Sequence, residues 1–425
     1  MHTHLEDLSN EIFFEILDYL HAFDIFIGFT SLNQRISSIL QFIPLHIIIS
    51  HDYCHRQIDF LFLHLTFHVH QVISLKIHDI ISDYSSVITL LFNQHNFVNL
   101  QSCIFTSIGS STKLENIFKN IESLDKLVTF TLFDPYLNLN EKDKCNLTRM
   151  MLMHKSSSLR SMVLKHSYDY ADISNYTSIS SNLTSLHLRI HGTLSTVSIH
   201  SVLLIFRLCH GIRHLGLILE HKFLVQNNDV NVSNSTISLN DTDYPILPKL
   251  ISFNLAVFLI YDIYAIAYML RCMPNLNRFN FFLVAQMRGL LYYCGLFNGY
   301  VWEDILKRYA PCLSTFEFQI SIQKNLSNLQ LDYIVNSFQY FVRKYPNWNM
   351  TIGRWRLASE IPEEFVMLKT LNYDKHKPNV KMLIHNISSQ SYETRSTTPI
   401  NDRHLFYSNI TDPTICMTNT KPTFT

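Results

Sequence analysis

Histidine is the residue type that first suggests chemistry in this chain, which has 22 histidines among 425 residues. His64 and His68 stand four residues apart, so one face of a helix would hold both, as in zinc-binding H-E-x-x-H motifs. Leu65 occupies the position of the catalytic glutamate, and Cys54-His55 has no second pair at zinc-finger spacing. We therefore predict no metal site and interpret the histidines as packing residues. Seven of them fall within one short stretch: His46, His51, His55, His64, His68, His70 and His78.

Other motifs that would indicate an enzyme are also missing from the sequence. There is no G-x-S-x-G elbow to place a nucleophilic serine. Glycine-rich phosphate loops are absent, and the chain has only 9 glycines. Glu363 and Glu364 follow Pro362 and are typical of a solvated helix start. We expect no enzymatic activity and no cofactor. A hydrolase built on an α/β sheet is a further possible class of protein, but no motif in the sequence supports it.

The charge balance and the hydropathy of the chain bear on whether it binds nucleic acid or a membrane. Lys+Arg and Asp+Glu balance at 34 each, which disfavours nucleic acid and a polybasic membrane surface. Residues 250–270 are apolar enough to span a bilayer, but Asp262 would then lie near mid-membrane, so a buried strand and helix are favoured. The eight cysteines form no C-x-x-C, and acidic residues interrupt any N-terminal signal core. We expect a protein of the cytoplasm or the nucleus.

The first 45 residues predict three short amphipathic helices. Ser9 and Glu11 suit a helix start, and Asp24 and Asn33 can begin the second and third helices. Pro44 ends the third. The apolar residues of the first helix form one stripe: Ile12, Phe13, Ile16, Leu17 and Leu20.

This segment resembles an F-box. The run from Leu8 to Ile12 matches the family's opening Leu-Pro-x-Glu-Ile, with Ser9 in place of the proline. Tyr19-Leu20, Asp24-Ile25 and the basic Arg35 continue the pattern. The resemblance implies that residues 1–45 bind a small Skp-type adaptor, which joins the chain to a cullin ubiquitin ligase. The residues that it assigns to adaptor binding are Leu8, Ser9, Ile12, Ile16, Leu20 and Ile25.

The middle of the chain alternates short apolar strands with helices. The strands read apolar-x-x-apolar-x-apolar, as in Leu183-Thr-Ser-Leu-His-Leu. Most of the intervening segments, residues 82–93, 112–124, 140–155, 196–209 and 262–272, begin on Ser, Thr, Asn or Asp, which cap helices. The copies start at Val72, Leu100, Leu127, Leu159, Leu183, Ile212, Leu250, Leu276 and Leu313.

A strand and a helix repeated at this spacing resemble a leucine-rich repeat, without the Asn or Cys that usually follows the strand. We therefore predict an α/β fold: an N-terminal three-helix F-box, then a strand–helix leucine-rich-repeat-like solenoid over residues 46–384. An open α/β domain with a parallel sheet shares the alternation and is the alternative. One helix is predicted at 328–344, Trp348 and Trp355 belong to a closing element, and a polar, disordered tail is expected at 385–425.

The combined resemblance predicts the substrate-recognition subunit of a cullin ubiquitin ligase, with an unknown protein substrate. The alternative is a non-catalytic repeat scaffold outside ubiquitination. Solenoid strands present alternate side chains on an open face, so we expect the substrate there. The residues predicted for this face are Arg160, His187, Arg213 and Asn280.

Overall fold

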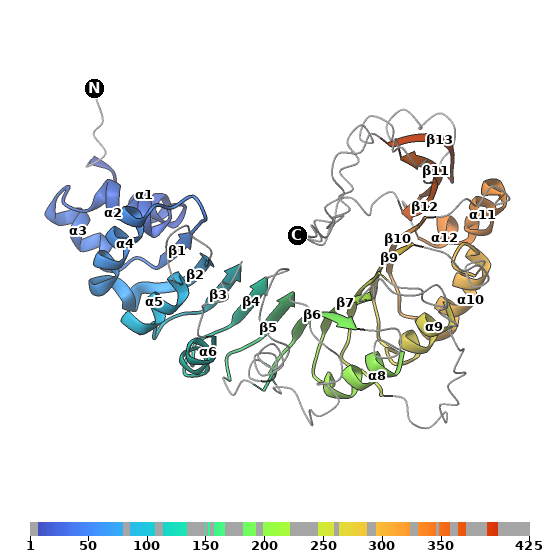
Figure 1. Ribbon diagram of the computed structural model, residues 1–425, viewed down its shortest axis with the longest axis horizontal. Coiled ribbons are helices and arrows are strands. Elements are labelled where there is room, and N and C mark those ends of the chain that lie inside the picture. The colour runs from blue at the N-terminus through green and yellow to red at the C-terminus, as the bar shows by residue number, and fades with distance from the viewer. Residues whose placement is uncertain are drawn as a thin grey trace, which may run out of the picture. The chain divides into compact units, whose positions relative to one another are not determined.

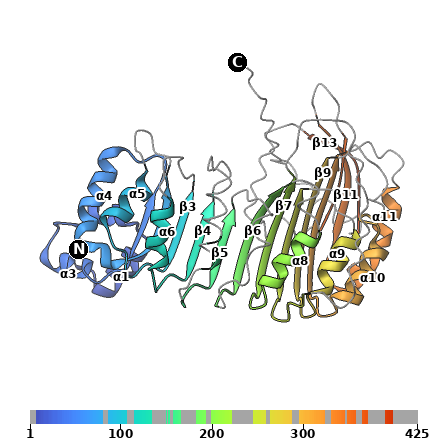
Figure 2. The same ribbon diagram turned by 60° about the horizontal axis from the view of Figure 1, so that its bottom comes forward.

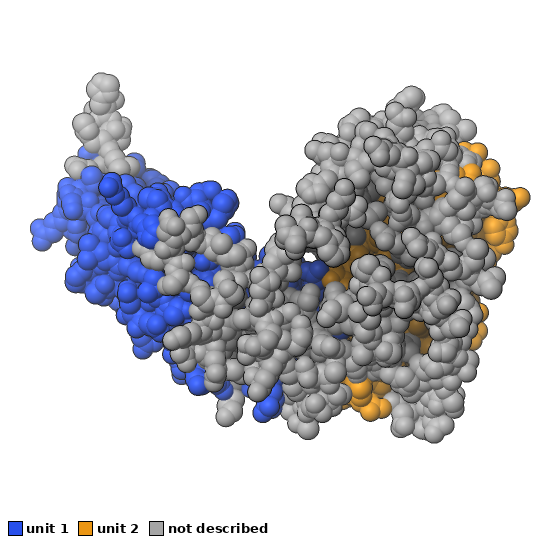
Figure 3. Space-filling model, viewed as in Figure 1, with its two compact units in different colours: residues 1–192 blue, residues 193–425 orange. Residues whose placement is uncertain are grey.

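The computed structural model describes residues 7–79, 86–106, 114–133, 149, 152–153, 157–165, 182–192, 199–221, 245–258, 263–286, 295–323, 330–345, 348–357, 364–370 and 389–397. Over these residues the chain is a mixed α/β structure with a 13-stranded sheet. It divides into two compact units, Met1–Gly192 (unit 1) and Thr193–Thr425 (unit 2), which Figure 3 distinguishes by colour.

Unit 1 begins with three helices and continues as a parallel sheet with helices along one face (Figures 1 and 2). Its strands follow chain order, β1-β2-β3-β4-β5-β6, and each neighbouring pair is parallel. The described elements are α1 (Asn10–Asp18), α2 (Ala22–Phe29), α3 (Gln34–Leu40), β1 (Leu45–Ile49), α4 (His55–His68), β2 (Val72–His78), α5 (Val87–Gln94), β3 (Ser102–Thr106), α6 (Leu114–Glu122), β4 (Thr129–Phe133), β5 (Ser161–Lys165) and β6 (Ser185–Gly192).

Unit 2 repeats the alternation and then changes direction. Strands β7 to β10 are parallel and in chain order, whereas β12, β11 and β13 join antiparallel beyond β10. Helices α8 to α10 lie along one face of its strands (Figure 2). The described elements are α8 (Ile199–Leu208), β7 (His214–His221), β8 (Ser252–Phe258), α9 (Ile263–Arg271), β9 (Arg278–Gln286), α10 (Gly299–Tyr309), β10 (Thr315–Gln323), α11 (Leu331–Ser337), α12 (Gln339–Lys344), β11 (Met350–Leu357), β12 (Glu364–Thr370) and β13 (Ser389–Ser396).

One turn geometry recurs before the parallel strands. The carbonyl of Val128, directly before β4, accepts two successive amides from the start of β5: Arg160 N and Ser161 N donate to it at 2.9 and 3.1 Å. Arg213 O accepts the same pair of hydrogen bonds from the amides of Ile251 and Ser252, at 2.9 and 3.1 Å. Because each turn is bonded to the turn beside it, the edge where the strands begin is held as firmly as the sheet.

The predicted apolar positions form the core, which confirms the strand pattern. All nine predicted copy starts are buried, and in the Leu183 copy the side chains of Leu183, Leu186 and Leu188 are no more than 3% exposed. Phe253, Phe279 and Phe316 lie in register on β8, β9 and β10 with ring centroids 5.7 Å apart in each neighbouring pair. Burial of each such side chain stabilises the fold by about 1.5–3 kcal/mol.

Residues 250–270 fold as favoured, into β8 and then α9. Over the described parts of the chain, no helix has both the length and the apolar composition needed to cross a bilayer.

Residues 1–45 belong to unit 1 together with the first strands. Two details of the prediction were wrong. The helix expected at 328–344 is broken at Phe338 into α11 and α12, where the Ser337 hydroxyl donates to Ile334 O at 2.7 Å and so competes with the helical pattern. Residues 389–396, placed in a disordered tail, form β13 paired with β11. The helix predicted at 140–155 lies almost wholly outside the described residues.

Candidate protein-interaction sites

The first candidate site is the surface of the three N-terminal helices. Helix α1 begins after Ser9, whose backbone is extended, and has Glu11 in its first turn. A hydrogen bond from Ser9 lowers the pKa of Glu11, which favours the negative charge at the positive end of the helix dipole. Phe13 and Leu17, four residues apart, are the side chains that α1 buries. These interactions set the orientation of α1 in the unit.

A second apolar stripe on α1 is not buried by the chain. Ile12 is 43% exposed and Tyr19 is 87% exposed, and Ile16 between them is half-buried. Positions separated by four and seven residues share one helix face. Leu8 and Leu20 are also half-buried, and Ser9 is exposed. Large exposed apolar side chains grouped on one helix face are typical of a protein contact.

Ile25 does not belong to this surface. Its side chain is 1% exposed, because the buried face of α2 packs toward β1 and α4. The assignment of Ile25 to adaptor binding was therefore wrong, and its role is to hold α2 in the core.

Arg35 joins the start of α1 to α3. Its Nε and Nη2 donate to Asn10 Oδ1 at 3.0 and 2.7 Å, and Nη2 also donates to Leu8 O at 2.6 Å. The guanidinium carbon lies 5.6 Å from the centre of the Phe13 ring. In the sequence, Arg35 was recognised only as the basic residue of the F-box pattern. In the structure it positions Leu8 and Asn10, which open the first helix.

Gln71 connects these helices to the sheet. Its Nε2 donates to Leu40 O and Ile43 O at 2.7 and 3.0 Å, and its Oε1 lies 2.6 Å from His68 Nδ1. The buried Gln71 therefore satisfies carbonyls at the end of α3. A groove of about 330 Å³ lies beside it, lined also by Phe42, Pro44, Asn99 and Lys126. Lys126 Nζ donates to Asn99 Oδ1 at 2.6 Å, so part of the polar lining is already used within the chain.

His64 and His68 pack on an aromatic ring. The Phe26 ring centroid lies 4.9 Å from that of His64 and 5.3 Å from that of His68. Burial lowers the pKa of His64, and a charged His68 would lower it further. Within the described ranges, no three His, Cys, Asp or Glu side chains are grouped as metal ligands.

The cysteines that the structure describes are free thiols, three of them buried. Burial raises the pKa of Cys209 and of Cys272 to about 12. Such thiols are protonated at neutral pH and are poor nucleophiles.

Of the four residues predicted for the substrate face, two lie on strands and two lie in turns. His187 and Asn280 are half-buried on β6 and β9. Arg160 and Arg213 are exposed in the turns directly before β5 and β7, so their assignment to a strand face was wrong. The sequence pattern placed the start of these two strands at the buried Leu159 and Ile212. The strands begin two residues later, at Ser161 and His214, so each arginine precedes its strand.

Asn280 instead lies in a polar row of unit 2. Asn254, Asn280 and Glu317 are direct register partners on β8, β9 and β10. The Oδ1 atoms of Asn254 and Asn280 are buried without a hydrogen-bond partner, and Glu317 is only 8% exposed. Polar residues between buried phenylalanines signal this row in the sequence, in Phe253-Asn-Leu, Phe279-Asn-Phe and Phe316-Glu-Phe.

We expect Asn280→Leu to leave the melting temperature unchanged or to raise it. The change removes a buried acceptor that has no donor, and an unsatisfied buried group costs about 1–3 kcal/mol. Asn275→Leu is the control: Asn275 Nδ2 donates to Pro248 O at 2.7 Å, so this change should destabilise by about 1 kcal/mol. Thermal melts followed by circular dichroism measure both. A lower melting temperature for Asn280→Leu would show that its amide is bonded in solution.

Comparison with known proteins places the chain in no family. No protein-family model matches the sequence, and no curated protein matches it. The geometry above is therefore the basis for a functional proposal.

Proposed function

We propose that this protein is an F-box substrate receptor of a cullin ubiquitin ligase of the cytoplasm or nucleus. In this proposal the N-terminal helices bind a Skp-type adaptor, and the repeats bind a protein substrate. The ligase partners supply the catalysis, so the chain itself acts by proximity.

The observation that carries the proposal is the apolar stripe of α1 and its C-cap, in which Ile12 and Tyr19 are exposed and Ile16 is half-buried. An apolar stripe on a helix of a stable domain is normally covered, and among the described residues only the Phe13 and Leu17 side is buried. Further apolar side chains of the same three-helix segment are exposed, namely Phe14 at 39%, Ile27 at 60% and Leu32 at 45%. Adaptor binding gives these side chains an apolar environment.

The recurring turns support the finer description of residues 46–384 as a leucine-rich-repeat-like solenoid. In these turns the amide of a buried residue donates a hydrogen bond to the carbonyl three residues earlier. Leu127 N donates to Leu124 O at 3.3 Å, and Leu276 N donates to Met273 O at 3.1 Å. In a solenoid each repeat contacts only its neighbours. The strand face opposite the helices, with His187 and Asn280, is the proposed substrate surface.

The test is capture of the adaptor. Full-length protein should bring down a Skp-type protein together with a cullin. Ile12→Asp combined with Tyr19→Asp should weaken capture by roughly a hundredfold or more, because a carboxylate cannot be desolvated at an apolar contact and anchor residues each contribute about 2 kcal/mol. Both side chains are exposed in the free chain, so the variant should fold normally.

Leu63→Asp combined with Phe67→Asp is the matched control. These side chains lie four residues apart on α4 and are 64% and 70% exposed, and the control should capture the adaptor as well as the parent protein does. If the parent protein captures no Skp-type protein, the receptor proposal is wrong, and a repeat scaffold outside ubiquitination takes its place.

A further inference from the structure

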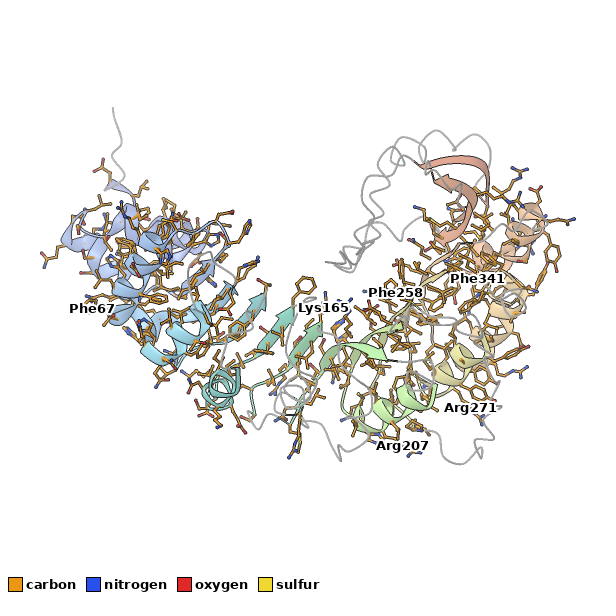
Figure 4. The ribbon with its side chains drawn as sticks, in the orientation of Figure 1. Phe67, Lys165, Arg207, Phe258, Arg271 and Phe341 are labelled. Carbon is orange, nitrogen blue, oxygen red and sulfur yellow. The ribbon has the colours of Figure 1, made fainter. Side chains whose placement is uncertain are left out.

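Positive charge gathers where the strands of unit 2 begin. Each helix in this unit returns to the sheet through a short turn, and the turns meet along one edge of the strands. Figure 4 labels Arg207 and Arg271, which end α8 and α9 on this side. The exposed cations of these helix ends and turns, called the basic edge below, are Arg207, Arg213, Lys249, Arg271, Arg278, Lys307, Arg308, Arg343 and Lys344.

No acid interrupts the basic edge within the described turn residues 207–214, 245–252, 271–278, 307–315, 343–345 and 348–350. The corresponding helix ends and turns of unit 1 mix the two signs. Lys119 and Glu122 lie in the last turn of α6, and Asp125, Lys126 and Arg160 are the charged residues described in the turns before β4 and β5. The fold does not require a cation in every such turn, because the described turns before β3 and β6 of unit 1 contain no Lys or Arg.

The helix dipole accounts for only part of the basic edge. Arg207, Arg271 and Lys307 lie in the last turns of their helices, where a cation is favoured. Lys307 and Arg308 also pair with Glu303 and Asp304 one helical turn away. Arg213 and Arg278 come after α8 and α9 have ended, and Lys249 lies in a described turn outside the described helices, so neither explanation covers them.

The backbones that carry Arg213 and Arg278 are held in a fixed row. Ile251 N donates to Arg213 O at 2.9 Å, and Arg278 N donates to Ile251 O at 2.9 Å. His214, Ser252 and Arg278 are direct register partners on β7, β8 and β9. Adjacent strands are about 4.8 Å apart, so the backbones that carry Arg213 and Arg278 lie about 10 Å from one another. Because this backbone is already fixed, only the side chains of the cations lose freedom when an anionic partner binds.

We propose that the basic edge of unit 2 binds an acidic polypeptide segment. An extended chain with alternate Asp or Glu side chains spaces its carboxylates about 6–7 Å apart, which is compatible with cations on a sheet edge. Single-stranded nucleic acid is the other extended polyanion that matches a row of cations. Proteins bind it with exposed aromatic side chains on which its bases stack. The aromatic side chains described in these turns are unsuited to that role, because Tyr309 is half-buried and Tyr345 and Trp348 are buried. This inference stands whether or not the N-terminal helices bind an adaptor.

The experiment measures binding of a fluorescent peptide of alternating Asp and Ser to full-length protein by anisotropy. Binding should weaken as salt is raised, because exposed charges are screened. Arg213→Glu, Lys249→Glu and Arg278→Glu together should weaken it by roughly tenfold or more, since three attractions become repulsions. A peptide of alternating Asn and Ser should not bind.

A control variant carries the same change in net charge in unit 1, at the exposed cations Arg56, Lys76 and Lys126. Their joint replacement by Glu should leave binding of the acidic peptide within about twofold. Equal loss in both variants would mean that net charge alone acts, which overturns the proposal. It is also overturned if the acidic peptide does not bind, or if a single-stranded RNA of similar charge binds more tightly. Adaptor capture by the Arg213, Lys249 and Arg278 variant should be unchanged, which separates this result from the test of the receptor proposal.

Discussion

Phe316→Ala is expected to lower the free energy of unfolding of unit 2 by about 3–5 kcal/mol. Phe316 is 1% exposed, and its ring lies 5.4 Å from Trp302, 5.1 Å from Phe318 and 5.8 Å from Phe341 between ring centroids. These partners come from α10, β10 and α12, so the truncation leaves a cavity where three elements meet. Aromatic pairs also add about 0.5–1.5 kcal/mol each beyond their buried area.

Denaturant unfolding followed by tryptophan fluorescence measures this effect. All three tryptophans of the chain, Trp302, Trp348 and Trp355, lie in unit 2, so the signal reports on that unit. Tyr300→Ala is the control, because Tyr300 is 56% exposed on α10 and its loss should change stability by no more than about 0.5 kcal/mol. Equal unfolding midpoints for the two variants would show that the aromatic cluster is not packed as described.

The strand cores could be predicted from the sequence because burial follows a local rule. In Leu127-Val-Thr-Phe-Thr-Leu the first, fourth and sixth side chains are 0% exposed, and the side chains between them, Val128 included, are not buried. Alternation along a strand fixes which side chains face the helices, and this needs no knowledge of distant residues. For residues 250–270 the strand and helix were favoured on a different ground, the cost of placing Asp262 near mid-membrane.

The sites could be predicted only in part because they depend on residues that the fold brings together. Ile12 and Ile16 were found from helix periodicity, but Ile25 has the same residue type and is buried by β1, which the first 45 residues do not include. The basic edge was missed for a related reason. Its cations are scattered over residues 207–344 in a chain of zero net charge, and only the stacking of successive turns collects them.

Gly299→Ala is expected to destabilise unit 2 by about 3 kcal/mol or more. Gly299 is the first residue of α10, and a Cβ added there would lie 2.4 Å from Ser337 O and 2.7 Å from Phe338 N. Both are backbone atoms at the break between α11 and α12, so no side chain can rotate away. The Gly299 amide also donates to Ser337 Oγ at 2.8 Å, and separating the helices would lose that buried bond.

Gly28→Ala is the matched control, with the opposite expected sign. Gly28 lies inside α2, and a Cβ added there meets nothing within 4 Å. Alanine in a helix is favoured over glycine by about 1 kcal/mol, so Gly28→Ala should raise the melting temperature slightly in circular dichroism and leave the tryptophan transition of unit 2 unchanged. Gly299→Ala should instead move the tryptophan transition to lower denaturant. If Gly299→Ala were as stable as the parent protein, α10 could not lie as close to the α11–α12 break as the structure places it, and the aromatic cluster around Trp302 would need another arrangement.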